Sequence, residues 1–445
     1  MKTRLSTLSF LGLFALFLAT SCSEDEDIVL GAEDYHSAVD KVTEIMVHDI
    51  FSPPVASRIY AYPNIAAYEI LAQSEAGLPS LAGRVRELGS VPQAKDTANL
   101  NPRLAALIAH MEVSKALIFS EDRMTSYQDS LYALWGKTNK KQFEASKAHA
   151  MVVVNHIKQW MDGDFYKQTR TMPKFSVNTD DPSRWQPTPP AYMDGIEPHW
   201  SKIRPFAIDS AAQFKPLPPP AFSLEKESDF YKELQEVYDI SNRITAEGDS
   251  SEEIAIARFW DCNPYVSVVR GHLMLATKKI TPGAHWIGIT KIAARKTNSD
   301  FNKTVTAYTQ TSIAIFDAFI SCWDEKYRSN LIRPETLINQ HIDDSWEPVL
   351  QTPPFPEYTS GHSVVSGAAS EALTDLFGDN FTFDDDTELP YGLPMRSFTS
   401  FRAAAQEAAI SRMYGGIHYR AAVEVGVDQG QSLGKLVVSK LNITN

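Results

Sequence analysis

A short segment in the last third of the chain combines a helix start with a histidine. Ser360-Gly361-His362 follows a proline-rich stretch and opens a helical pattern. Ser360 is a natural N-cap, Gly361 lets the backbone approach a ligand closely, and a helix N-terminus presents free N–H groups and partial positive charge. The segment therefore predicts an anion site with a proton donor, His362. Taken alone, it would also suit an ordinary capped helix.

A second segment, Lys326-x6-Arg333-Pro334, can bring an ammonium and a guanidinium towards one place. Lys326 falls three residues after Trp323, on or beside the apolar face of a predicted helix, and a lysine there needs a partner. Pro334 ends the helical register. A surface cation pair is the simpler interpretation of this segment by itself.

A third segment runs from Ser411 to His418. A strong helical pattern ends at Gly415-Gly416, and His418 opens the next helix, which places Arg412 and His418 on either side of a tight turn. This pattern is common, so it indicates a functional site only in combination with the other two segments.

Together the three segments assemble a set that fits a tetrahedral oxyanion. Two arginines offer forked donors to paired oxygens, and a lysine adds a point charge. One histidine can attack or coordinate the central atom while the other gives or takes a proton. The cations are Lys326, Arg333 and Arg412, the neutral donors are Ser360 and Gly361, and the histidines are His362 and His418.

The ordered set resembles the vanadium-dependent haloperoxidase and type 2 phosphatidic-acid phosphatase superfamily, whose motifs are Lys-x6-Arg-Pro, Pro-Ser-Gly-His and Ser-Arg-x5-His-x3-Asp. The resemblance implies an α-helical fold, which in the haloperoxidase branch consists mainly of two four-helix bundles. It also implies residue roles. Lys326, Arg333, Ser360, Gly361 and Arg412 would hold vanadate or phosphate, His418 would be the vanadium ligand or the phosphatase nucleophile, His362 the acid–base group, and Trp323 and Phe355 the border of the halide pocket.

The sequence departs from the family motifs at two positions. Thr359 replaces the proline before Ser-Gly-His, and Ala422 occupies the position of the final aspartate. The usual carboxylate near His418 is therefore expected to be missing. Glu424 lies six residues after His418, about 240° around a helix, and does not obviously replace it.

The function expected from the resemblance is that of a vanadium-dependent haloperoxidase, with vanadate as cofactor and hydrogen peroxide and halide as substrates. An acid phosphatase is the first alternative, in which His418 would form a phosphohistidine from a phosphoester. A non-catalytic carbohydrate- or phosphate-binding lipoprotein is the alternative from another class, because 8 tryptophans and 17 tyrosines could stack on sugars.

The N-terminus predicts export. Lys2 and Arg4 precede an apolar run at residues 10–19 that is too short to cross a bilayer, and small residues lead to Cys22. This layout looks like a bacterial lipobox, with a signal peptide at residues 1–21, lipidated Cys22 and an acidic tether at 22–32. We expect an outer-membrane lipoprotein on the periplasmic or cell-surface face, and a plain secreted protein is the alternative.

Composition excludes several classes of protein. The 445 residues are 43% hydrophobic and 22% charged, which excludes a disordered or multi-span membrane chain. The formal net charge of −13 argues against a nucleic-acid partner.

His272 and His285 are predicted to be structural, and no cation site is predicted from ligand spacing. Cys262 and Cys322 are predicted to be buried free thiols rather than a disulfide.

Helical periodicity dominates the chain and predicts an all-α fold. Eleven of the 26 prolines lie between residues 173 and 220, which predicts an extended crossing segment between a helical half at 33–225 and a catalytic helical half at 226–445. The oligomeric state is left open. Helices are expected at residues 33–51, 56–72, 102–120, 123–161, 228–246, 251–261, 265–279, 302–327, 361–377, 399–414 and 418–441.

Overall fold

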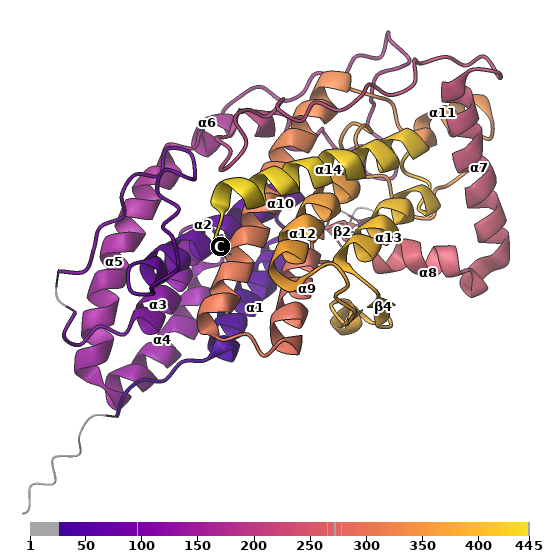
Figure 1. Ribbon diagram of the computed structural model, residues 1–445. Helices are drawn as coiled ribbons and strands as arrows, with labels where there is room; N and C mark the ends of the chain where they lie inside the picture. The colour runs from indigo at the N-terminus through magenta and orange to yellow at the C-terminus, as the bar shows by residue number, and fades with distance from the viewer. Residues whose placement is uncertain (1–25, 96, 265, 271–272, 277, 444–445) are drawn as a thin grey trace, which may run out of the picture.

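The computed structural model describes residues 26–443, except residues 96, 265, 271–272 and 277. Helices dominate these residues, so the predicted all-α fold class is confirmed (Figure 1). The helices are α1 (Ala32–Asp49), α2 (Pro53–Ala72), α3 (Pro102–Lys115), α4 (Glu121–Thr138), α5 (Lys140–Asp162), α6 (Tyr166–Thr169), α7 (Asp229–Glu247), α8 (Glu252–Phe259), α9 (Pro282–Lys296), α10 (Phe301–Ser329), α11 (Pro334–His341), α12 (Gly361–Phe377), α13 (Phe401–Tyr414) and α14 (Arg420–Leu441). Short 3-10 turns are η1 (Trp200–Lys202), η2 (Gly248–Ser250) and η3 (Leu389–Tyr391).

Helices α1 to α5 gather at one end of the molecule, and α12 to α14 lie towards the other end, beside α7 and α8 (Figure 1). The long helix α10 packs against both α2 and α12 and so joins the two groups. Asp300 starts α10 as its N-cap, accepting a hydrogen bond from the Lys303 N–H at 2.8 Å. A single hydrophobic cluster extends from α1 to α14. The division of the chain at residue 225 stays a prediction.

Helices α12 and α14 approach each other closely because glycines line their contact. A Cβ on Gly434 would lie 2.7 Å from the carbonyl oxygen of Ala368, and one on Gly367 would lie 2.8 Å from that of Val427. A Cβ on Gly430 would overlap the carbonyl oxygen of Val364. The backbones of α12, which Ser360 caps, and of α14, which follows His418, are therefore in direct contact.

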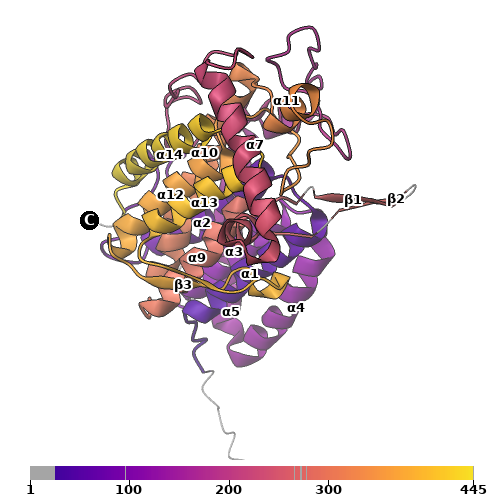
Figure 2. The same cartoon turned by 90° about the vertical axis from the view of Figure 1, so that its right-hand side faces the viewer.

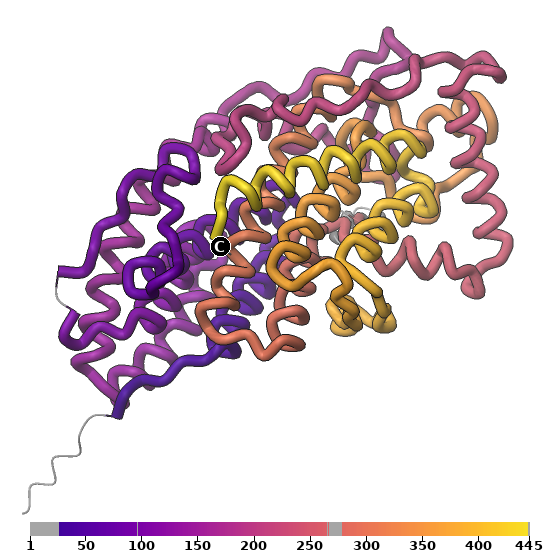
Figure 3. The backbone as a smooth tube through the Cα atoms, in the orientation of Figure 1, coloured from indigo at the N-terminus to yellow at the C-terminus, as the bar shows by residue number. Residues whose placement is uncertain are grey.

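The proline-rich crossing segment packs onto the helices. Figure 3 shows the chain between α6 and α7 running along one edge of the molecule. Trp185, Trp200 and Phe206 are fully buried. Asp317 of α10 accepts backbone N–H groups at Phe206, Ala207 and Ile208, at 2.6 to 2.9 Å. One buried carboxylate thus fixes this segment to the central helix.

The prediction of a helix at residues 265–279 is wrong. The described part of this range forms an antiparallel hairpin of β1 (Ser267–Arg270) and β2 (Leu273–Ala276), which projects from the body in Figure 2. A second hairpin pairs β3 (Phe383–Asp385) with β4 (Arg396–Phe398). A short apolar run has no periodicity that separates a strand from a helix, which explains the error.

Other helix boundaries also differ from the prediction. The expected helix at 123–161 is two helices, because Asn139 ends α4 in an extended conformation and caps α5 through the Gln142 N–H. Helices α9 and α11 were not predicted, although each begins at a proline, Pro282 and Pro334, as helices often do.

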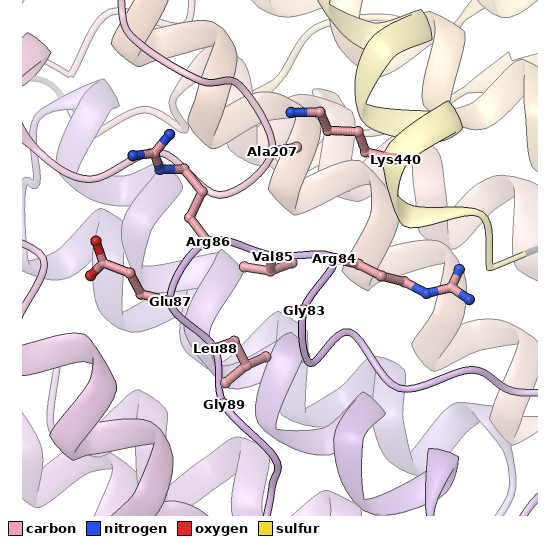
Figure 4. Close-up of a pocket in the computed structure, with 9 residues that line it drawn as sticks. All are labelled: Gly83, Arg84, Val85, Arg86, Glu87, Leu88, Gly89, Ala207 and Lys440. Atoms are coloured by element: carbon pink, nitrogen blue, oxygen red, sulfur yellow. The ribbon is translucent and has the colours of Figure 1, made fainter.

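One hollow of the surface lies far from the predicted site in sequence, and its two arginines have a structural role. It measures ≈ 620 Å³ and is formed by residues 83–89 with Ala207 and Lys440 (Figure 4). Arg84 Nη1 donates to the carbonyl oxygens of Leu441 and Asn442 at 2.6 and 2.8 Å, at the C-terminal end of α14. Arg86 donates to the carbonyl of Asp209. Arg84 and Arg86 therefore bind main-chain carbonyls of the fold, and Lys440 pairs with the carboxylate of Asp209 at 2.6 Å.

Among the described residues, no helix is both long and apolar enough to cross a membrane. The predicted signal peptide at 1–21 and Cys22 lie outside the described residues. Cys262 and Cys322 are buried and unbonded to each other, which confirms the prediction of free thiols.

The contact between α12 and α14 generates a stability prediction. Gly430→Ala should destabilise the protein by about 1–3 kcal/mol, because its methyl group has to displace the backbone of α12. Urea unfolding monitored by circular dichroism measures the change. The control is Gly89→Ala, where an added Cβ meets nothing within 4 Å and the change should stay within about 0.5 kcal/mol. Equal stability of the two variants would contradict the packing described.

Candidate functional site

The structure brings the predicted residues together around one small cavity between α10, α12 and α13. This cavity measures ≈ 30 Å³. Of the predicted set, its lining includes Trp323, Phe355, Gly361, His362, Arg412 and His418. Lys326, Arg333 and Ser360 lie beside it and are buried.

Helix ends position the two histidines. The Ser360 hydroxyl caps α12 by accepting the Ser363 N–H at 3.3 Å, so His362 stands in the first turn. Helix α13 ends at Tyr414, and Gly416 turns the chain with a φ of 75°, a conformation that favours glycine. His418 lies two residues after Gly416, just before α14 begins. The Ser360 N–H donates to the carbonyl of Ala422 at 3.0 Å, which ties the two helix starts together.

The three cations are held by main-chain carbonyls more than by carboxylates. Lys326 Nζ donates to the carbonyls of Pro356 and Glu357, both at 3.0 Å. Arg333 donates to the carbonyls of Phe355 and Ile417 at 3.0 and 2.7 Å. These carbonyls fix the orientation of the cations without neutralising their charge.

Arg412 is held in a similar way. Its Nη1 donates to the carbonyl of Trp260 at 2.8 Å, and its Nη2 lies 3.9 Å from a carboxylate oxygen of Asp261. The carboxylate of Asp261 also pairs with Lys279. Arg412 therefore shares its nearest carboxylate with another cation.

Burial perturbs the charged groups of the site. It lowers the pKa of Lys326 to about 7 and that of Arg333 to about 10. Burial and the neighbouring cations lower the pKa of His418, and burial and Arg412 lower that of His362, both well below the usual value. Both histidines are therefore neutral at pH 7 in the protein alone.

Glu357 supplies a carboxylate that the sequence analysis missed. Its Oε1 lies 2.7 Å from His418 Nδ1 and also accepts the Tyr419 N–H at 3.0 Å. Because this oxygen accepts, the proton of the neutral imidazole belongs on Nδ1, and Nε2 keeps its lone pair. Burial raises the pKa of Glu357 to about 8, against the effect of Arg333 and Lys326.

The expectation that His418 lacks a carboxylate is therefore wrong. Ala422 is buried, and Glu424 pairs with Arg420 at 3.1 Å, as its position around the helix predicted. The replacement comes from the segment before α12, three residues before Ser360. An acidic residue in that rigid, proline-rich segment was the available signal in the sequence.

Several polar atoms of the site are buried without a partner. Within the described residues, Arg333 Nη2, Arg412 Nε and His362 Nε2 make no hydrogen bond. Each such atom costs about 1–3 kcal/mol when left unpaired, so the arrangement calls for a ligand that accepts hydrogen bonds. His418 Nε2 differs from these atoms, because it accepts a hydrogen bond from Arg333 Nη1 at 3.1 Å. The donors suit a compact oxyanion.

Trp323 and Phe355 form an aromatic wall of the cavity. Their ring centroids are 5.0 Å apart, and Lys326 Nζ lies 4.9 Å from the centroid of Phe355. Arg333 lies over the same ring at 5.1 Å. The wall keeps water away from the cations and adds cation–π attraction to their positioning.

The comparisons with known proteins agree with this geometry. Residues 306–444 match a family model described as the VCPO second helical-bundle domain. The crystal structure of a bacterial vanadium-dependent iodoperoxidase superposes with a TM-score of 0.90 and 69% sequence identity, over 94% of this chain and 98% of that one. No curated protein matches the sequence significantly.

Bacterial vanadium-dependent chloroperoxidase is more distant. Its holo form superposes with a TM-score of 0.65 and 17% identity, over 88% of this chain and 93% of that one. Its apo form gives 0.64 and 17%, over 88% and 94%. These two likenesses concern the fold, whereas the 69% identity over nearly the whole length identifies the family. The chain belongs to the vanadium-dependent haloperoxidases.

Proposed function

We propose that this vanadium-dependent haloperoxidase uses hydrogen peroxide to oxidise iodide. The haloperoxidase activity, the vanadate cofactor and the halide and peroxide substrates follow from family membership. The choice of iodide is supported by the 69% identity to a protein described as an iodoperoxidase. The acid phosphatase and the carbohydrate-binding lipoprotein are not favoured.

The residues of the site fit vanadate. The unpaired donors of Arg333 and Arg412 point to an acceptor-rich ligand, and Lys326 adds charge beside them. In this proposal Lys326, Arg333, Ser360, Gly361 and Arg412 hold the oxygens, and His418 Nε2 is the ligand of vanadium. Bound vanadate would supply a Lewis-acidic centre at which peroxide is activated for two-electron oxidation of the halide.

His362 is proposed to move protons at the site. Its Nε2 is unpaired within the described residues, while its ring also has a backbone hydrogen bond to Trp260. A neutral imidazole held in this way can accept a proton from hydrogen peroxide at Nε2 and later return it.

Trp323 and Phe355 would border the halide, where a polarisable aromatic surface suits a large, weakly hydrated anion.

The iodide proposal generates the first activity prediction. Iodide oxidation by the vanadate-depleted protein should rise with added orthovanadate up to one equivalent and should exceed bromide oxidation. His418→Ala should abolish it, because Nε2 is the proposed vanadium ligand. Triiodide absorbance under peroxide measures the rate. His341→Ala, on the exposed surface of α11, is the control and should keep the parent rate. Activity that survives vanadate depletion, or that persists in His418→Ala, would contradict the proposal.

Glu357 generates a prediction about binding. Glu357→Gln should weaken orthovanadate binding roughly 10–100-fold, because the partner that fixes the tautomer and orientation of His418 loses its carboxylate. Calorimetric titration of the vanadate-free protein gives the dissociation constant. Glu424→Gln removes an exposed carboxylate from the start of α14 and should leave the constant unchanged. Equal constants for the two variants would show that Glu357 does not position His418.

We also propose that the chain is exported and lipidated at Cys22. The lipobox-like residues 19–22 and the preceding apolar run support this proposal. In cells of a bacterium that processes lipoproteins, Cys22→Ser should abolish labelling by a radioactive fatty acid and shift the protein from the membrane to the soluble fraction. Cys322→Ser, which changes a buried thiol, should remain labelled. Labelling that persists in Cys22→Ser would overturn the assignment.

A further inference from the structure

A buried cluster of potential metal ligands lies next to the cavity. Cys262 follows α8, His285 lies in the first turn of α9, and Glu388 precedes η3. All three are buried, and one ligand atom from each lies within 4.8 Å of the others. The three residues are far apart in sequence, so ligand spacing could not reveal the cluster.

The separations of the three ligand atoms match a tetrahedral metal centre. Cys262 Sγ lies 3.5 Å from His285 Nδ1 and 3.7 Å from Glu388 Oε1, and the last two atoms are 3.2 Å apart. Zinc bonds of about 2.3 Å to sulfur and about 2.0–2.1 Å to nitrogen and oxygen, at tetrahedral angles, predict edges of about 3.6, 3.5 and 3.3 Å in the same order. The three ligand atoms thus lie at separations close to those of such a centre.

The far side of the His285 ring has the partners expected for a metal ligand. Nε2 lies 2.8 Å from Asp385 Oδ2 and 2.8 Å from Thr387 Oγ1. Metal-bound histidines almost always donate their second N–H to such a carboxylate, which fixes the ring orientation. Trp260 stacks on the ring with centroids 4.4 Å apart. The ring is therefore locked with Nδ1 facing Cys262 and Glu388.

We propose that Cys262, His285 and Glu388 bind one divalent transition-metal ion, zinc by the character of the donors, with a fourth position left for water. Binding displaces the thiol proton of Cys262 and any proton on His285 Nδ1, while the proton on His285 Nε2 stays there and is donated to Asp385 in a hydrogen bond.

The ion would position the vanadate site without taking part in its chemistry. Cys262 and Asn263 line the same cavity as His362, and the carbonyl of Trp260 accepts from Arg412 Nη1. An ion bound to Cys262 would fix this segment to α9 and η3. Metal binding at this cluster does not require bound vanadate. All three proposed ligands are side chains of the protein, and none of them belongs to the residues proposed to hold vanadate.

Cobalt(II) is the probe for this site. Titration of the chelator-treated full-length protein with Co²⁺ should reach one equivalent and produce visible bands of tetrahedral cobalt together with a near-ultraviolet thiolate-to-cobalt charge-transfer band. One equivalent of Zn²⁺ should remove these bands. Cys262→Ser should lose the charge-transfer band, and Asp385→Asn should bind cobalt roughly 10–100-fold more weakly.

Matched controls separate this site from the rest of the chain. Cys322→Ser and Cys22→Ser should keep the charge-transfer band, and His418→Ala should bind cobalt like the parent, which distinguishes the cluster from the vanadate site. As a second readout, Zn²⁺ should raise the melting temperature of the parent but not that of Glu388→Gln. A parent protein without the band, a band that persists in Cys262→Ser, or equal zinc stabilisation of Glu388→Gln would each overturn the proposal.

Discussion

Lys326, Arg333 and Arg412 bring three positive charges into a region that water does not reach. Removing such charges from water is costly, and the neighbouring acidic groups offset only part of the cost, because Asp261 is shared with Lys279 and burial raises the pKa of Glu357 to about 8. The lowered pKa values of Lys326 and Arg333 express this imbalance. An anion bound among the three cations offsets their buried positive charge, so binding of the ligand should stabilise the fold around the site.

Much of the arrangement serves to keep these cations in place before the ligand arrives. The carbonyls that hold them belong to non-helical segments at residues 355–357, 417 and 260. Such segments keep a fixed shape only when firmly packed, and prolines, aromatic rings and the close α12–α14 contact provide that packing. Preorganised donors of this kind cost no reorganisation when charge develops on the ligand.

The cations and histidines of the site could be predicted from the sequence because they lie near helix ends. The patterns that mark a helix end depend only on residues nearby in the chain. Ser360 before a helical pattern and the Gly415-Gly416 turn before His418 both follow from short-range rules. Glu357 could not be assigned in this way, since its approach to His418 depends on how a non-helical segment packs across the start of α14. The β1–β2 hairpin was missed because its apolar run suits either a helix or a strand.

The hydrogen bonds of Asp317 also bear on how the chain folds. This carboxylate joins α10 to residues about 110 positions earlier, and α10 also covers α2, made more than 200 residues before it. During synthesis α3 and α5 can cover part of α2 early, but the face of α2 that packs against α10 stays uncovered until most of the chain exists. Contacts of such long range slow folding and leave apolar surface open to chaperones and to aggregation in the meantime.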